Sequence, residues 1–287
     1  HTNDRRQRQM CIRDSPKRWD APISDADNWP RCIQIAWQLH DDYGMLIEHK
    51  DFIVTPDGFD IPFESEQIHG ISTALAQKEG VPLTQVLAAF EDALSKTQYV
   101  VGHNVGFDVN IMGAELHRMQ RDTSITTIPV LDTCTEETAT LCQLPGGRGG
   151  KFKLPTLTEL YTHLFNESFK EAHNATADVE ATTRAFFELI RQNKLTNDSL
   201  EDSASVVARI QESYANQVPV VGLTHQNLKA ASAKLAQQEQ PVAQNAPPPT
   251  QTVSDLPFAH LHTFSQFSVL QSTCLLYTSD AADDRSC

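Results

Sequence analysis

The sequence has few cysteines, few basic residues and no long apolar run, and each shortage narrows the kind of protein it encodes. Six of the 287 residues are cysteine and none lies in a C-x-x-C motif, so free thiols in a reducing cytoplasm are the simplest interpretation. No apolar run approaches the roughly 18 residues that a membrane span requires. We therefore expect a soluble, cytoplasmic protein with no membrane partner.

Acidic residues outnumber the basic ones. The chain carries 23 Lys and Arg against 37 Asp and Glu, for a net charge of −14, which argues against a broad, non-specific DNA-binding surface. It does not exclude a metal-dependent nuclease, because bound cations offset carboxylates within such a site. Arg148, Lys151 and Lys153 are local candidates for contacting a strand, although a solvated loop explains them at least as well.

Two short segments contain the residue types that phosphodiester hydrolysis requires. They are residues 103–108 (His-Asn-Val-Gly-Phe-Asp) and 173–178 (His-Asn-Ala-Thr-Ala-Asp). The reaction needs charge neutralisation at the phosphorus and a deprotonated water, and two divalent ions held by carboxylates supply both. Asp108 and Asp178 are candidate ligands, and His173, with an unperturbed pKa of about 6.5, is a candidate base. Taken singly, Asp108 also fits a helix cap and His173 a solvated loop.

Hydrophobic periodicity places both carboxylates at the start of helices. Residues 99–102 form a short buried strand directly ahead of the first segment, and Asp108 then opens an amphipathic helix that ends near Met119. Asp178 begins a helix that continues to Ile190. Both carboxylates are therefore expected on rigid elements, as a functional site requires.

The rest of the chain alternates strands with helices, which indicates an α/β layer fold. Turn signals and helix caps delimit these elements. The expected strands are 32–39 and 46–54, joined as a hairpin by a turn at 41–44, and 128–131. The expected helices begin after Ser72, Pro82 and Thr156 or span 136–144.

From about residue 29 to 192 the chain resembles the DEDDh proofreading exonucleases, the family of the epsilon subunit of bacterial DNA polymerase III. Three blocks carry the resemblance: residues 68–72 (Ile-His-Gly-Ile-Ser), residues 102–108, and residues 173–178 with the spacing H-x-A-x-x-D. The resemblance implies an RNase H-like α/β fold with a mixed central sheet flanked by helices. It also implies two Mg²⁺ or Mn²⁺ ions and removal of nucleotides one at a time from a DNA 3′ end.

The resemblance assigns roles to individual residues. Those implied to act on metal and water are Asp108 and Asp178, as ligands, and His173, as the base that deprotonates the attacking water. Those implied to contact the DNA are Asn104 and Phe107, along the strand path, and His69, Gly70 and Ile71, as the wall around the terminal nucleotide.

One signature of the family is missing. The family has an Asp-x-Glu on its first strand, which supplies two more metal carboxylates, and the expected positions here are Gln9 and Cys11. The nearest acid, Asp14, lies in the wrong register. We therefore predict that the first strand, which by resemblance occupies the middle of the sheet, is missing.

Both ends of the chain resemble translated sequencing-adapter text, over residues 1–15 and 274–287. We therefore expect that neither end belongs to the fold; an ordinary divergent terminus is the alternative. Between them we expect the exonuclease domain over 16–194 and then, over 195–255, a polar helix and an extended, mobile linker rich in Ala, Gln and Pro.

Residues 256–273 resemble the opening of the PHP domain of a DNA polymerase III alpha subunit. This stretch contains His260 and His262, and an H-x-H on a strand points two imidazoles to the same side, which suits metal binding. Some bacterial replicative polymerases fuse a proofreading domain ahead of PHP and polymerase domains. The resemblance thus implies those domains, the sliding clamp and the replisome as partners, with a DNA 3′ end as substrate.

We therefore expect a proofreading 3′→5′ DNA exonuclease, part of a DNA polymerase III alpha-like polypeptide, that releases nucleoside monophosphates. With half of its metal carboxylates missing, the chain as given is expected to be nearly inactive. Two alternatives remain. One is an enzyme of the same fold that acts on RNA or oligonucleotides, and the other is a non-catalytic module that docks a polymerase.

Overall fold

The computed structural model describes residues 16–121, 123–168, 174–195 and 204–239. In chain order the elements are β1 (Gln34–His40), β2 (Leu46–Ile53), α2 (Phe63–His69), α3 (Thr73–Glu79), α4 (Leu83–Leu94), β3 (Val100–Gly102), α5 (Gly106–Arg118), the 3-10 turn η1 (Ser124–Thr127), β4 (Val130–Asp132), α6 (Glu136–Cys142), the 3-10 turn η2 (Arg148–Gly150), α7 (Leu157–Phe165), α8 (Ala175–Arg191), α9 (Ala204–Ser213) and α10 (Leu228–Glu239). No helix within these ranges is long and apolar enough to cross a membrane.

The strands form two pairs. β1 and β2 are an antiparallel hairpin, and the carboxylate of Asp41 closes its turn by accepting from the amides of Tyr43 and Met45 at 2.9 and 2.8 Å. β3 and β4 are parallel, with Gly102 opposite Asp132. Among the described residues these pairs are separate two-stranded sheets. The α/β class is confirmed, while a continuous mixed sheet with a missing central strand stays a prediction.

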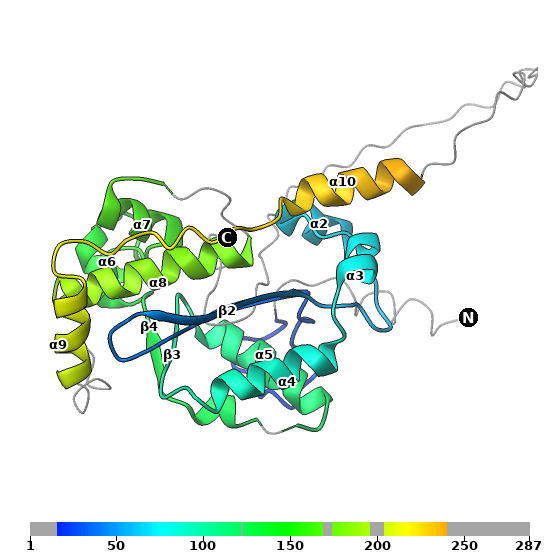
Figure 1. The fold of residues 1–287 in the computed structure, drawn as a ribbon, viewed down its shortest axis with the longest axis horizontal. Helices are drawn as coiled ribbons and strands as arrows, with labels where there is room; N and C mark the ends of the chain where they lie inside the picture. The colour runs from blue at the N-terminus through cyan, green and yellow to red at the C-terminus, as the bar shows by residue number, and fades with distance from the viewer. Residues whose placement is uncertain (1–15, 122, 169–173, 196–203, 240–287) are drawn as a thin grey trace, which may run out of the picture.

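Alternation along β1 builds three layers, because successive side chains of a strand point to opposite faces. Trp37 and Ile35 lie in the core formed with α4 and α5, whereas Ala36, between them, belongs to the cluster formed with α7 and α8. Figure 1 shows the hairpin between these helical layers, with α8 on one side and α4 and α5 on the other.

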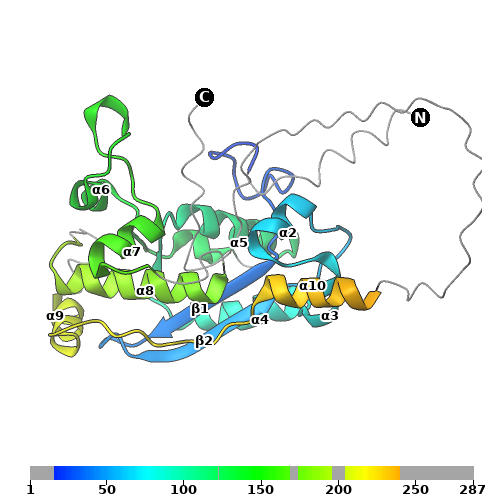
Figure 2. The same ribbon diagram turned by 90° about the horizontal axis from the view of Figure 1, so that it is seen from above.

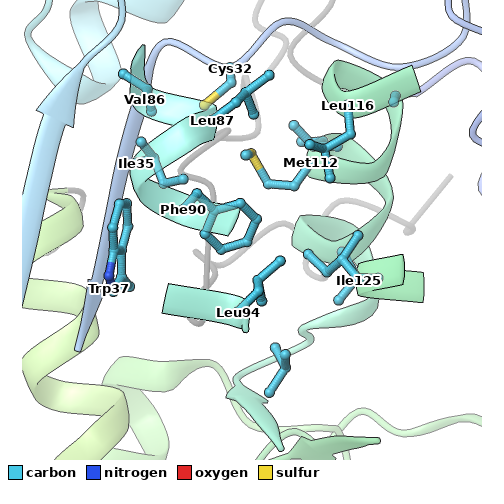
Figure 3. Close-up of a cluster of buried hydrophobic side chains, with 14 of the residues drawn as sticks. Cys32, Ile35, Trp37, Val86, Leu87, Phe90, Leu94, Met112, Leu116 and Ile125 are labelled. Atoms are coloured by element: carbon cyan, nitrogen blue, oxygen red, sulfur yellow. The ribbon is translucent and has the colours of Figure 1, made fainter. Parts of the chain in front are cut away.

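Phe90 of α4 lies in the middle of the larger core. Its ring centroid is 5.7 Å from that of Trp37, and Figure 3 shows it between the strand and α5, which contributes Met112 and Leu116. All four side chains are at most 1% exposed. Burying large side chains so completely stabilises the fold by roughly 1.5–3 kcal/mol each, and it holds α5 and α4 against β1.

Helix α8 packs against both β1 and β3 and so spans the two sheets. Between the sheets lies a cavity of about 260 Å³, and its lining includes Gln38 of β1, Val101 of β3 and Thr182 of α8. Gln38 Nε2 and Thr182 Oγ1 are buried and have no hydrogen-bond partner among the described residues. Such groups are rare in native proteins, so this cavity is a place where the fold lacks polar contacts.

Most of the elements expected from the sequence are confirmed, including the hairpin, β3, β4 and the capped helices. Ser72 Oγ accepts from the amide of Leu75 at 3.1 Å, at the start of α3. Thr156 and Glu159 form a reciprocal capping box at the start of α7. Each cap satisfies backbone amides that have no partner within the helix.

The starts of the two carboxylate helices differ from the sequence prediction. α5 begins at Gly106, so Asp108 lies inside its first turn and does not cap it. α8 begins at Ala175, where the side chain of Asn174 accepts from the amide of Thr176 at 3.1 Å. The cap is therefore Asn174, and Asp178 lies one turn into the helix.

α10 is a second difference, since the sequence predicts that the polar helix in residues 195–255 is followed by an extended, mobile linker. Leu228 and Leu235 lie seven residues apart, on one face of the helix, and both are buried with Ile71 and Leu75. The alanines between them favour helix. The proline-rich stretch at 246–250 lies outside the described residues.

A buried carboxylate ties α5 to the chain ahead of β1, and we predict that the fold depends on it. Glu115 is fully buried and accepts from Arg31 Nε and the amide of Cys32, each at 2.9 Å. Glu115→Ala leaves these donors without their acceptor and is expected to cost about 3–5 kcal/mol in urea unfolding. Glu136→Ala, which breaks an exposed ion pair with Lys151, should cost less than about 1 kcal/mol. Equal losses for the two variants would contradict the assignment.

Candidate functional site

The carboxylate of Asp132 organises the turn between β3 and α5. It accepts from the amides of Asn104, Val105 and Cys134 at 2.7, 3.1 and 2.8 Å. Asn104 has a φ of 59°, a left-handed conformation that these bonds help to hold. Burial raises the pKa of Asp132, while the three amides act in the opposite direction. Sequence reasoning missed this residue, and the available signal was an aspartate at the end of a strand.

His103 opens the first carboxylate segment, yet its contacts are those of a structural residue. Its Nε2 lies 3.0 Å from the carbonyl oxygen of Pro155, and its Nδ1 lies 3.0 Å from the hydroxyl of Thr133. Complete burial lowers the pKa of His103 to about 4. The neutral ring thus donates to the carbonyl of Pro155 and links the end of β3 to the chain just ahead of α7.

Asp108 is the most unusual carboxylate in the described residues. Its side chain is fully buried, and neither oxygen has a hydrogen-bond partner there. Burial raises the pKa of Asp108 well above its usual range, and the nearby Asp132 and Cys32 raise it further. A buried ionised carboxylate without partners is costly. A cation bound at its oxygens would remove that cost, so this residue fits a metal ligand.

Asp178, the second candidate ligand, is 1% exposed and lies on the buried face of α8. Among the described residues no three His, Cys, Asp or Glu side chains are grouped so that they could hold a metal ion. The pairing of Asp108 with Asp178 in one centre therefore stays a prediction. His173, the candidate base, lies outside the described residues, and so do His260 and His262.

Of the two residues expected along the path of the DNA strand, Asn104 lies in the turn ahead of α5 and Phe107 lies in the first turn of that helix. Asn104 is half-buried, and Phe107 is only 4% exposed. Trp19, from the chain ahead of β1, covers Phe107, with the ring centroids 5.3 Å apart. Trp19 itself is 38% exposed.

The residues expected to wall the terminal nucleotide form the corner between α2 and α3. Gly70 takes a φ of 78° and ends α2, and the amide of Ile71 donates to Nδ1 of His69 at 3.0 Å. His69 and Ile71 are both buried. Burial lowers the pKa of His69 to about 4, with a smaller effect from the charge of Lys229.

α10 lies directly against this corner. Ser232 Oγ donates to the carbonyl of Gly70 at 2.7 Å and accepts from the amide of Ser72 at 3.0 Å. The approach at Gly70 is so close that a Cβ there would lie 2.7 Å from the backbone nitrogen of Lys229. The corner that was expected to wall the terminal nucleotide is therefore covered by α10, a helix that lies beyond the expected exonuclease domain of residues 16–194.

The chain leading into α10 follows α8. Glu180 accepts from the amides of Gly222 and Leu223, and Asn174 Nδ2 donates to the carbonyl of Gln226 at 3.2 Å. Figures 1 and 2 show this segment running beside α8 before it enters α10. We call residues 218–239 the C-terminal strap. It contacts both the corner at Gly70, between α2 and α3, and the start of α8.

Two of the three basic candidates are engaged with acidic neighbours. Lys151 pairs with Glu136, and Lys153 Nζ lies 3.3 Å from Glu159. Arg148 lies in the exposed turn η2. These contacts indicate that the basic residues belong to a solvated loop and do not form a patch that binds a DNA strand.

Comparison with known proteins shows which family and which relatives this chain is similar to. A family model described as Exonuclease (RNase_T) matches residues 26–186. The DNA polymerase III PolC-type of Streptococcus pyogenes serotype M2 (strain MGAS10270) is 31% identical over 144 residues, which is 50% of this chain and 9% of that relative. The protein of the same name from serotype M5 (strain Manfredo) is 31% identical over 148 residues, or 52% of this chain and 9% of the relative. The chain thus spans less than a tenth of these relatives.

The contacts of Ser232 predict how firmly the strap is held. Ser232→Ala removes both the donor to Gly70 and the acceptor for Ser72, so the amide of Ser72 should exchange its hydrogen about tenfold faster. Lys234→Ala, on an exposed part of α10, should leave that exchange unchanged. Hydrogen exchange followed by NMR or mass spectrometry measures both. Unchanged protection in Ser232→Ala would show that α10 is held by other contacts.

The environment of His103 predicts a loss of stability in acid. Its pKa falls from 6.5 to about 4 on folding, so the unfolded chain takes up the proton more readily and stability drops as the pH falls through that window. The shift corresponds to roughly 3 kcal/mol. The free energy of unfolding is measured in urea at about pH 7 and about pH 4.5. Between these two pH values, it should fall less in His103→Asn than in the parent, because the variant has no imidazole to protonate. An identical pH dependence would refute this account.

Proposed function

Because the chain belongs to the exonuclease family, we propose that its domain is a 3′→5′ DNA exonuclease that hydrolyses the terminal phosphodiester of a DNA strand. The similarity to the PolC-type polymerases supports a proofreading role within a DNA polymerase III-like polypeptide. A cytoplasmic location follows from that role.

The observation that carries the proposal is the carboxylate of Asp108. It is fully buried, lacks hydrogen-bond partners among the described residues, and has a strongly raised pKa. Proteins tolerate such a group where it serves function. Asp108 and Asp178 would hold the divalent cations, which when bound neutralise phosphate charge and make water more acidic. His173 would accept the proton of the attacking water.

We further propose that the space between the two sheets receives one more strand, which carries the missing Asp-x-Glu. Three observations support this. β1 and β3 each pair on one side only among the described residues, α8 packs across both, and the cavity between them contains the unpartnered polar atoms of Gln38 and Thr182. A strand there would pair both edges, and unpaired edges otherwise favour aggregation.

The wider context is also a proposal. The PolC-type relatives are polymerases of which this chain matches 9%, so PHP and polymerase domains, the sliding clamp and the replisome are partners expected of the whole polypeptide. His260 and His262 would then belong to the PHP domain.

The role of Asp108 can be tested without activity. At neutral pH in EDTA, Asp108→Asn should be more stable than the parent by at least about 1 kcal/mol, because the variant neither buries a charge nor takes up a proton on folding. Addition of Mg²⁺ or Mn²⁺ should raise the melting temperature of the parent but not of the variant. Asp57→Asn, at an exposed position, should respond to metal like the parent. A variant that is still stabilised by metal would remove Asp108 from the ligand set.

The reaction is tested by Mg²⁺-dependent release of mononucleotides from labelled single-stranded DNA. We expect little release from the chain as given, and much more after a family-like first strand is grafted ahead of Pro16. Asp108→Ala should abolish the release, and His173→Ala should slow it by about 10² to 10⁴. Faster release from RNA would favour the related RNA or oligonucleotide exonuclease. Polymerase binding by a grafted protein that cleaves neither substrate would favour the docking module.

A further inference from the structure

The chain has three tryptophans, and only one of them is exposed. Trp29 and Trp37 are 3% and 1% exposed, whereas Trp19 is 38% exposed. Trp19 packs on Phe107 with ring centroids 5.3 Å apart and ring planes 48° apart. Phe107 directly precedes Asp108 in the first turn of α5 and is itself buried. The aromatic surface that solvent meets beside this turn is therefore Trp19.

The backbone around Trp19 is held in place. The amide of Arg18 donates to Asn28 Oδ1 at 2.7 Å, and Asn28 Nδ2 donates back to the carbonyl of Arg18 at 2.9 Å. The amide of Lys17 also donates to the carbonyl of Asn28, which is itself buried. Trp19 is thus presented by a clamped loop, and a ligand that stacks on it pays little to order the backbone.

Two cations stand next to this ring in the chain. Lys17 and Arg18 are exposed, and within the described ranges Arg18 pairs with Asp20 at 3.9 Å, through side chains that are 63% and 87% exposed. Exposed pairs of this kind are weak, so the guanidinium is available to an anion. Asp25 and Asp27 lie further along the same loop, which confines the basic residues to one end of it.

We propose that Lys17, Arg18 and Trp19 form a binding platform for the single-stranded segment that leads to the DNA 3′ end, an inference that rests on the proposed function. One base stacks on Trp19 and the cations contact the neighbouring phosphates. Stacking on an aromatic ring tolerates every base but requires that the base be free of its own stack. The platform therefore selects single-stranded or frayed ends over duplex without reading sequence.

Intrinsic fluorescence tests the platform directly, because the other two tryptophans are buried. The full chain is titrated with an oligothymidylate in Ca²⁺, and binding should quench tryptophan emission. Trp19→Phe should retain packing on Phe107 and bind within a few-fold of the parent, without the quenching. Trp19→Ala should weaken binding roughly 5- to 100-fold, and Arg18→Ala should lower the salt dependence by about one phosphate contact.

The matched control is Phe63→Ala, because Phe63 is an exposed aromatic, at 67%, at the start of α2; it should bind like the parent. DNA binding by the parent with unchanged tryptophan emission, and with equal affinity in Trp19→Ala, would overturn the platform and leave the proposed exonuclease intact. If neither the chain nor its grafted form binds any single-stranded DNA, the proposed function fails together with the platform.

Discussion

Three backbone amides donate to the half-buried carboxylate of Asp132, and the placement of the candidate site depends on these bonds. They fix Asn104 and Val105, and the residue that follows, Gly106, begins α5. The orientation of that first turn decides that Asp108 is buried and that Phe107 lies under Trp19. The core around Phe90 then holds the helix against β1. A strand-end carboxylate with no expected catalytic role thus positions the residues that carry the proposed function.

Polar groups that the fold leaves unsatisfied are informative because folding selects against them. In the part of the chain that the structure describes, such groups occur at Asp108, the candidate metal ligand, and at Gln38 and Thr182, which border the cavity between the sheets. A bound cation would satisfy the carboxylate of Asp108, whereas the amide of Gln38 and the hydroxyl of Thr182 require hydrogen-bonding partners. One additional strand with acidic residues would answer both needs, since its backbone would pair the open edges and its carboxylates would complete a cation site.

Local sequence patterns predicted the hairpin, β3, β4 and the capped helices, because hydrophobic alternation, helical periodicity and capping residues can each be recognised within a few neighbouring residues. What the sequence did not reveal depends on distant partners. Ser232 bonds to the corner at Gly70 and Ser72, about 160 residues away, and composition alone favoured a linker there. His103 lies in a block that looks catalytic, yet its position between Thr133 and Pro155 gives it a structural role. Asp132 shows the converse, an ordinary strand-end residue whose role appears only once β4 is paired with β3.

A net charge of −14 constrains how such a domain can handle DNA. Without a broad basic surface, the counterion release that drives non-specific binding is small, and duplex should be held weakly. A stacked base beside two cations would instead give a modest, local affinity that only an unpaired strand end can use. Weak affinity would suit the proposed proofreading role, because attachment to a polymerase raises the effective concentration of the DNA end and makes tight independent binding unnecessary. The acidic balance, which first argues against a DNA-binding protein, is thus compatible with one that receives its substrate from a neighbouring domain.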